Sequence, residues 1–156
     1  MNAYIVKTYR TETSHIVRNA VSIRCSENFH GHSYVWETEI NGPVKENGMV
    51  LDFKELQPIR EFIDKFDHAT VLWEKDSEKV KKFFMEECKR TLIMKKNTTA
   101  ENMASLVFYF VAHWLRENHP SCICVKVKVH ETITGCAIAD QCDSDDVLIY
   151  CHNDKS

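Results

Sequence analysis

Alternation of hydrophobic and polar positions predicts that the chain opens with extended strands. Residues 3–9 and roughly 15–24 alternate, and the pattern returns at 32–40 before Asn41-Gly42-Pro43 interrupts it. A period of two places every second side chain on the same face of a sheet. We therefore expect strands ahead of this interruption and a short extended run at 49–52 after it.

The middle of the chain changes to helical spacing. Apolar residues recur every three or four positions over 56–66, and Asp52 ahead of them is a candidate N-cap. Because Pro58 has no N–H to donate, we expect a separate 3₁₀ turn first and a regular helix from Pro58. The pattern also predicts a charged surface helix at 76–88 and a short strand at 91–94.

The strongest helical pattern spans 98–118, where an apolar stripe runs from Met103 to Leu115. Thr98 and Glu101 fit a capping box at its start. Such a stripe is typical of a helix that covers a sheet.

Residues 122–132 alternate again and predict a strand, with 135–139 returning as its hairpin partner. Every second residue of this strand is expected to share one face. These residues are Ile123, Val125, Val127 and Val129. The predicted order is therefore two N-terminal strands, a helical middle and two more strands.

Composition narrows the classes of function. With 156 residues and 44% hydrophobic content, the chain is expected to form one domain over 1–156, with an acidic C-terminal tail at 140–156. The net charge of −3 gives no basic field for nucleic acid, and no apolar run is long enough to cross a bilayer. We therefore expect neither nucleic acid nor a membrane among the partners.

The number and spacing of the cysteines indicate the cellular compartment. The seven cysteines include no Cys-x-x-Cys pair, and residues 1–10 carry no secretory-signal pattern. Reduced thiols fit this usage better than disulfides do. We expect a cytoplasmic protein.

Candidate chemistry centres on His30-Gly31-His32. On a strand, the two imidazoles can aim at a single point, and His15 could supply a third nitrogen. Three neutral imidazoles leave one corner of a zinc tetrahedron open for water or substrate, as in catalytic zinc sites. Coincidence is the alternative in a chain with eight histidines, but Gly31 allows close approach and a strand pattern follows, which favours the metal.

Ordered motifs over most of the chain carry a family resemblance. They are Ser14-His15, Cys25-x-x-x-x-His30-Gly31-His32, Val50-Leu51-Asp52-Phe53, Phe66-Asp67-His68, Thr98-Thr99-Ala100-Glu101-Asn102, and Val129-His130-Glu131-Thr132 with Gly135-Cys136. In these motifs the chain resembles the 6-pyruvoyl-tetrahydropterin synthase and 6-carboxy-tetrahydropterin synthase family. The resemblance implies an α+β tunnelling fold, an antiparallel four-stranded sheet with two main helices on one face. Three such sheets would join into a barrel, and two trimers would stack into a homohexamer.

The resemblance also implies the site residues. His15, His30 and His32 would hold Zn²⁺, and Cys25, Asp67 and His68 would transfer protons. The expected partner is a small-molecule pterin triphosphate, 7,8-dihydroneopterin triphosphate, whose vicinal hydroxyls can occupy the open zinc position. The alternative for Cys25 is a small buried hydrophobe, and for Asp67-His68 an ordinary loop end.

Further residues would bind the substrate. Glu131 ends an apolar strand, where an unpaired carboxylate is costly, and the pterin ring offers two adjacent donors that match a carboxylate. A solvated strand end is the alternative. By resemblance, Thr99 and Glu101 help to frame the pterin pocket, although the capping box alone also explains Glu101. The cations that could meet the triphosphate are Lys7, Arg10, Arg18 and Arg24.

The spacing between Cys25 and His30 leaves the product open. Within the family, bacterial queuosine-pathway enzymes usually have three residues between the cysteine and the histidine pair, and animal biopterin enzymes have five. This chain has four. Glu27 stands three residues before His30, where a folate-pathway branch carries glutamate in place of the cysteine. An exposed loop acid is the alternative for Glu27.

The resemblance implies a zinc-dependent lyase that converts 7,8-dihydroneopterin triphosphate to 6-carboxy-5,6,7,8-tetrahydropterin in queuosine (7-deazaguanine) biosynthesis. Formation of 6-pyruvoyl-tetrahydropterin is one alternative. Side-chain cleavage to 6-hydroxymethyl-7,8-dihydropterin for folate, through Glu27, is another. A hypothesis of a different class is a non-catalytic zinc- or pterin-binding module. The presence of Cys25, Asp67 and His68, which a binder does not need, favours the enzyme.

Overall fold

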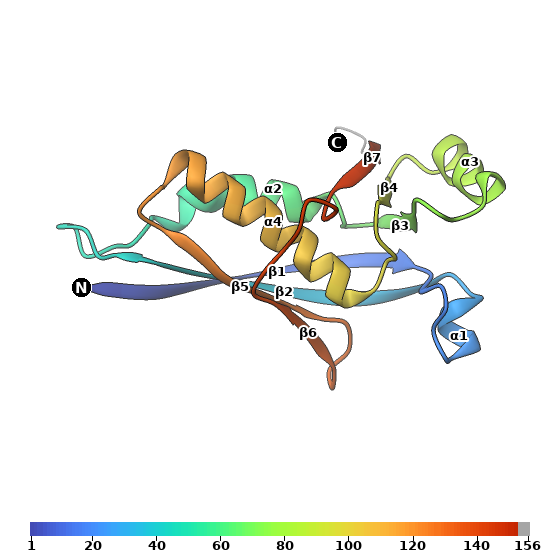
Figure 1. Ribbon diagram of the computed structural model, residues 1–156, viewed down its shortest axis with the longest axis horizontal. Coiled ribbons are helices and arrows are strands. Elements are labelled where there is room, and N and C mark those ends of the chain that lie inside the picture. Colours follow the sequence, from blue (N-terminus) through green and yellow to red (C-terminus); the bar gives the residue numbers. More distant parts are fainter. Residues whose placement is uncertain (153–156) are drawn as a thin grey trace.

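The computed structural model describes residues 1–152, so the end of the predicted acidic tail, 153–156, lies outside the described part. The helices are α1 (Ile23–Ser26), the 3₁₀ helix η1 (Phe53–Leu56), α2 (Gln57–Asp64), α3 (Glu78–Glu87) and α4 (Ala100–Asn118). The strands are β1 (Asn2–His15), β2 (His30–Pro43), β3 (Ala69–Trp73), β4 (Thr91–Met94), β5 (Ile123–His130), β6 (Cys136–Ala139) and β7 (Leu148–His152). The fold is α+β, and α2 and α4 lie over one face of the sheet (Figure 1).

The sheet is larger than predicted. The seven strands of the described part form one mixed sheet in the order β6-β5-β2-β1-β3-β4-β7. Its β6-β5-β2-β1 half is antiparallel and corresponds to the expected four strands. The four-strand prediction was nevertheless wrong, because β1 also pairs in parallel with β3 at 13–15, and β4 and β7 extend the sheet from there.

The first connection also differs from its prediction. β1 runs unbroken to His15, so the strand expected over 15–24 was wrong beyond its first residue. The chain turns there instead, with Asn19 at φ 65°, a left-handed conformation that asparagine tolerates better than most residues. The reversal lets β2 pair antiparallel with β1 and places His15 opposite His30.

The segment before α2 follows the predicted helical pattern. Asp52 caps η1 by accepting the amide of Lys54 at 2.9 Å, and Glu55 completes a capping box. Pro58 lies in the first turn of α2, as expected. The extended run predicted at 49–52 was wrong, because these residues enter the η1 cap directly and form no strand.

α4 is the predicted helix over the sheet, but its cap lies one residue later than expected. Oγ1 of Thr99 accepts the amide of Asn102 at 3.2 Å, so the capping box of Thr98 and Glu101 was wrong. Thr98 is buried instead, and its hydroxyl donates to the carbonyl of Ile16 at 2.7 Å. Glu101 is exposed on the first turn of the helix.

β5 forms the predicted hairpin with β6 but contains a β-bulge. Its pairing with β2 skips Val125, which moves Cys124 onto the core side and leaves Ile123 61% exposed. The expectation that Ile123 and Val125 share a face with Val127 and Val129 was therefore wrong, although the latter two are fully buried.

The C-terminal segment contains a strand that the sequence pattern did not predict. β7 pairs antiparallel with β4, and Leu148 packs against the core. The helix expected at 76–88 and the strand expected at 91–94 are confirmed as α3 and β4. Within residues 1–152, no helix is both long enough and apolar enough to cross a membrane.

Candidate metal centre and active site

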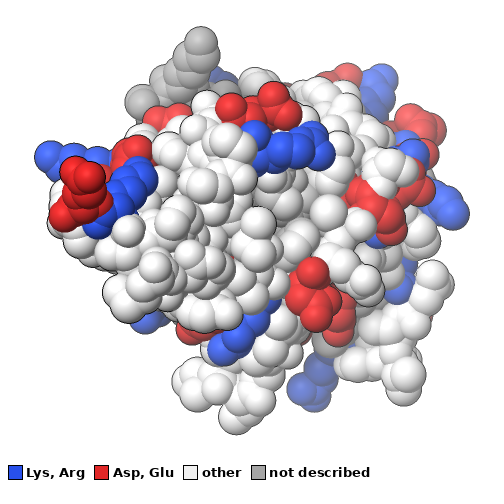
Figure 2. Space-filling model, turned by 60° about the vertical axis from the view of Figure 1, so that its left-hand side comes forward, with Lys and Arg blue, Asp and Glu red and all other residues white. Residues whose placement is uncertain are grey.

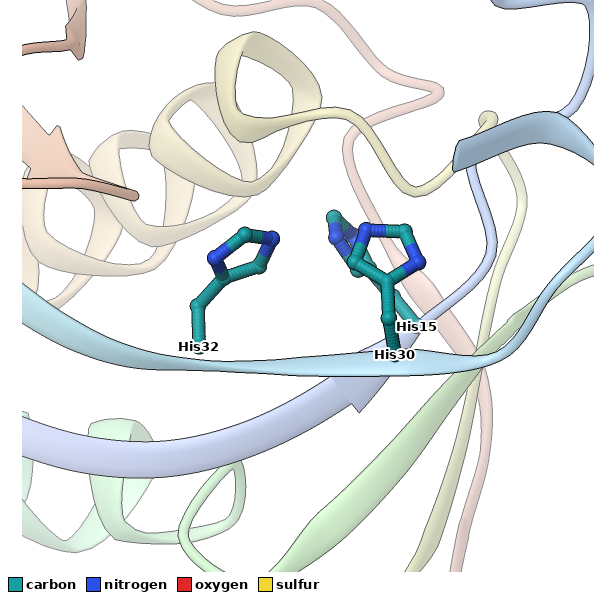
Figure 3. Close-up of side chains that lie close together, drawn as sticks. All are labelled: His15, His30 and His32. Atoms are coloured by element: carbon teal, nitrogen blue, oxygen red, sulfur yellow. The ribbon is translucent and has the colours of Figure 1, made fainter. Parts of the chain in front are cut away.

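Three histidines converge at one end of the β1–β2 pair. His15 ends β1, and His30 and His32 open β2. Their ligand atoms all lie within 4.8 Å of one another, the one such group of metal-binding side chains within residues 1–152. In Figure 3 the three rings rise from the same side of the strands, beside the loop that enters α4. The structure thus brings together the histidines that the sequence pattern singled out.

Backbone carbonyls orient two of the three rings. Nδ1 of His15 lies 2.7 Å from the carbonyl oxygen of Thr98, and Nδ1 of His30 lies 2.9 Å from that of Asn28. Because a carbonyl only accepts, each Nδ1 donates its N–H, and in the neutral form of such a ring Nε2 is the nitrogen that keeps a lone pair. Such contacts are typical of histidines that bind metal. The donor set therefore fits an ion that prefers imidazole, such as Zn²⁺.

Burial keeps the deepest ring neutral. The side chain of His15 is fully buried, and burial lowers its pKa to about 4 against the opposing effects of the Thr98 carbonyl and the Glu131 carboxylate. Burial also lowers the pKa of His32. Neutral imidazole is the form that binds a metal ion, so neither ring has to lose a proton first at neutral pH.

The metal-free protein is expected to lose stability as the pH falls from 6.5 to about 4. Folding lowers the pKa of His15, so over this range the unfolded chain binds a proton that the folded protein does not. The full titration is worth about 3 kcal/mol. Denaturant unfolding of metal-free wild type and His15→Gln across this range measures the effect. The variant should show the flatter pH dependence, and equal slopes would contradict the assignment.

A carboxylate faces the cluster from the end of β5. Oε1 of Glu131 lies 3.5 Å from Nε2 of His15 and 3.9 Å from Nε2 of His32. The hydroxyl of Tyr34 donates to the same oxygen at 3.2 Å. Burial and the nearby carboxylate raise the pKa of Tyr34 above its usual range, so this donor stays protonated. Tyr34 therefore holds the carboxylate in place, with 32% of the Glu131 side chain still exposed.

Two solvent-open grooves meet at His32. One, of about 390 Å³, is bounded by β1, β2 and the start of β3 and includes His68. The other, of about 790 Å³, runs past Glu131 to the β5–β6 turn. The side chains of His32 and Glu131 are 22% and 32% exposed, so a ligand can reach them from solvent, whereas His15 is enclosed.

Asp67 and His68 form a separate pair ahead of β3. Nδ1 of His68 lies 3.0 Å from Oδ2 of Asp67, and the amide of Glu12 donates to Oδ1 at 2.8 Å. Burial alone would raise the pKa of Asp67, but these hydrogen bonds outweigh it and lower the pKa below its ordinary value. The His68 side chain is 73% exposed. The pair shares a groove with His32 but contacts β1 rather than the three rings.

Cys25 and Glu27 lie on the connection between β1 and β2. Cys25 is a half-buried free thiol on α1, and Glu27 is exposed at the C-terminal end of that helix. Within residues 1–152, neither joins the group of three histidines. The structure places both candidate bases on the segment that links His15 to the other two candidate ligands.

The basic residues suggested for the triphosphate differ in their surroundings. Nε of Arg18 donates to the carboxylate of Asp76 at 2.7 Å, and that carboxylate is 1% exposed, so Arg18 already has a buried partner. Nζ of Lys7 lies 5.0 Å from the centre of the Phe53 ring. Arg10 and Arg24 are exposed.

Sequence reasoning missed the residues that hold the site in place. Thr98 and Asn28 act through their carbonyls, which leave no signal in a sequence. Tyr34 could have been found, because it lies two residues after His32 and so shares its face of β2. Thr99, suggested for the pterin pocket, caps α4 beside this network.

The molecule is thus an α+β protein with a candidate three-histidine metal centre beside a carboxylate at the end of antiparallel strands. The profile of the family described as 6-pyruvoyl tetrahydropterin synthase matches residues 4–142. The chain belongs to this family.

Individual relatives agree with this assignment. The 6-carboxy-5,6,7,8-tetrahydropterin synthase of Helicobacter pylori strain J99 is 35% identical over 140 residues, which cover 85% of this chain and 70% of that protein. The crystal structure of an uncharacterized protein from Wolinella succinogenes has a TM-score of 0.76 at 16% identity and covers 90% of this chain and 98% of its own. The Caenorhabditis elegans 6-pyruvoyl tetrahydropterin synthase has a TM-score of 0.65 at 24% identity and covers 90% of this chain and 96% of its own. The two structures support the fold.

Proposed function

We propose that this protein is a zinc-dependent lyase that converts 7,8-dihydroneopterin triphosphate to 6-carboxy-5,6,7,8-tetrahydropterin in queuosine biosynthesis. The convergence of His15, His30 and His32, with oriented rings, is the observation that carries the proposal. Family membership supports pterin lyase chemistry, and the name of the Helicobacter relative supports the 6-carboxy product.

The geometry supports the proposed binding roles. His15, His30 and His32 would hold Zn²⁺, which as a Lewis acid would acidify the substrate hydroxyls and the neighbouring carbon. Glu131, held by Tyr34, would accept the paired N–H groups of the pterin ring. Its position beside His15 and His32 would bring the substrate side chain to the histidines.

Proton transfer would fall to Cys25 and the Asp67–His68 pair. An ionised Asp67, 3.0 Å from Nδ1 of His68, would accept that N–H and orient the imidazole for proton transfer. Cys25 would act as the base that removes the carbon-bound proton of the substrate. Cleavage to the 6-hydroxymethyl product through Glu27 stays the second candidate, because Glu27 lies exposed on the same segment as Cys25.

The free edge of β1 supports an assembly of copies. β3 pairs only with residues 13–15, so within residues 1–152 the earlier part of this edge has no strand partner. Tyr4 and Val6 on β1 are 64% and 49% exposed. A long unpaired edge with exposed apolar side chains favours pairing with another chain. We propose that such edges join the sheets into a barrel and a homohexamer of two trimers.

Surface charge supports a small-molecule partner, and the free thiols support a cytoplasmic location. On the face shown in Figure 2, basic and acidic side chains are interspersed, which suits a small-molecule partner better than nucleic acid. All seven cysteines are free thiols, which suits a reducing cytoplasm.

Incubation of zinc-loaded protein with 7,8-dihydroneopterin triphosphate, followed by mass analysis of the pterin, tests the proposed function. We expect 6-carboxy-5,6,7,8-tetrahydropterin. A 6-pyruvoyl or 6-hydroxymethyl product would replace the proposed product with one of the alternatives. Unchanged substrate together with a zinc-independent pterin complex would reject the enzyme in favour of the binding module.

Glu131→Gln separates pterin binding from zinc binding. We expect neopterin affinity to fall about 10–100-fold, because a charged acceptor is lost, while zinc affinity stays near that of wild type. Fluorescence titration measures the affinity for neopterin, and chelator competition measures the affinity for zinc. Glu39→Gln, which alters a carboxylate paired with Lys126 at 3.0 Å, is the matched control and should change neither. Loss of zinc in Glu131→Gln would instead make Glu131 a metal ligand.

A further inference from the structure

Residues 143–152 lie beyond the part of the chain that matches the family profile. They form an acidic turn followed by β7, which pairs with β4. In Figure 1 the C-terminal segment runs from β6 past α4 to the side of β4. It therefore ends beside β4. The loop that follows β4 enters α4 at the histidine cluster.

Asp146 anchors this segment. Its side chain is 1% exposed, and Oδ1 accepts from Nζ of Lys96 at 2.9 Å. Its Oδ2 accepts from the hydroxyl of Ser105 at 2.7 Å and from the amide of Asp143 at 2.8 Å. A buried carboxylate is costly unless it is paired and hydrogen-bonded, so these contacts act together. Asp146 thereby ties the acidic turn to both the loop before α4 and the helix itself.

Lys96 leads directly to the residues that orient the first candidate metal ligand. The side chain of the next residue, Asn97, donates to the carbonyl of Arg18 at 2.7 Å and accepts the amide of Thr98 at 2.9 Å. The carbonyl of Thr98 then accepts from Nδ1 of His15 at 2.7 Å. Three consecutive residues thus connect the buried carboxylate of Asp146 with the His15 ring.

A neighbouring ion pair has the same chemistry as the Lys96–Asp146 pair but is exposed. Nζ of Lys95 lies 2.6 Å from Oδ1 of Asp145, but these side chains are 43% and 53% exposed. Exposed pairs of this kind contribute little to stability. Asp145 therefore has the same chemistry as Asp146 in the adjacent position, without the burial.

We infer that Asp146 is a positioning residue for the metal centre, which acts through Lys96 to hold the Thr98 carbonyl against His15. The inference rests on the proposed function, because it takes His15 to be a zinc ligand. Loss of the buried partner leaves Lys96 with Asp143, an exposed carboxylate at 2.8 Å, and so weakens the hold on the Thr98 carbonyl that fixes the His15 ring. Loss of a direct outer partner of a metal-binding histidine lowers metal affinity about 10–100-fold, and Asp146 acts further out. The effect expected is at the low end of that range.

Zinc affinity of Asp146→Asn, measured with Zn²⁺ alone by competition with a chromophoric chelator, tests the inference. Asparagine keeps the shape of the side chain and removes its charge. We expect zinc binding about tenfold weaker than in wild type, and within about twofold of wild type in Asp145→Asn. Affinity is expressed per folded molecule, with the free energy of unfolding measured separately. Wild-type affinity in folded Asp146→Asn would overturn the inference, because a residue that only fastens the tail changes stability alone.

Ser105→Ala provides a milder variant in case Asp146→Asn does not fold. It removes one of the hydrogen bonds to Asp146 and leaves the ion pair with Lys96. Its zinc affinity should fall between those of Asp145→Asn and Asp146→Asn, and an affinity equal to that of Asp145→Asn would count against the inference. Failure of the wild-type protein itself to bind zinc would overturn both this inference and the proposed function. Zinc binding that needs the three histidines but ignores Asp146 and Ser105 would overturn the inference alone.

Discussion

His32→Ala is expected to weaken zinc binding by more than about a hundredfold and to abolish lyase activity, because loss of even an outer partner costs about 10–100-fold. His32 is a better ligand to remove than His15, since its side chain is 22% exposed whereas that of His15 is fully buried. Its truncation therefore disturbs the core less. Zinc content and affinity, with a parallel measurement of unfolding, separate the loss of metal from the loss of fold.

His113→Ala is the matched control for this variant. His113 is an exposed histidine towards the C-terminal end of α4, away from the three rings. His113→Ala should leave zinc affinity and activity unchanged. Chelator treatment of wild type should likewise remove activity, and added Zn²⁺ should restore it. A His32→Ala protein that binds zinc as tightly as wild type would show that the three rings do not share an ion.

Cys25→Ala is expected to lower formation of the 6-carboxy product by at least about a hundredfold, the lower end of what a general base contributes. Alanine keeps the size of a small side chain but has no ionisable group. The variant should retain zinc, because Cys25 lies outside the histidine group. Cys88→Ala is the control, since Cys88 is also a half-buried free thiol. Steady-state rates with mass identification of the pterin measure the effect.

Glu27→Ala is the counterpart of this experiment. The substitution should leave formation of the 6-carboxy product unaffected and should abolish any 6-hydroxymethyl product, because Glu27 is the candidate base for that cleavage. Equal loss of both products in each single variant would contradict this division between Cys25 and Glu27.

The sequence pattern located the candidate ligands because each lies on a strand. His30 and His32 share a face through the period of two, which needs no knowledge of the fold. For His15 the pattern placed the residue at the start of a strand, whereas it ends β1. The histidines converge because the antiparallel pairing sets His15 opposite His30. Alternation along one strand does not reveal which strand it pairs with.

Contacts made through the backbone or between distant segments could not be predicted in the same way. The capping pattern of Thr98 and Glu101 was plausible locally, but tertiary contacts bury Thr98 and leave Thr99 as the cap. β7 escaped prediction because it lies in a segment that the acidic residues marked as a tail, and its pairing with β4, a distant strand, stabilises it. The bulge at Val125 is likewise set by pairing with β2.

A crystal structure of the zinc-loaded protein, with anomalous scattering recorded at the zinc edge, would locate the ion and its ligands. We expect one zinc ion bound by Nε2 of His15 and His30 and by a ring nitrogen of His32, at about 2.0–2.1 Å, with a displaceable water in the fourth position. A cage of four protein ligands, or zinc bound away from these rings, would contradict it.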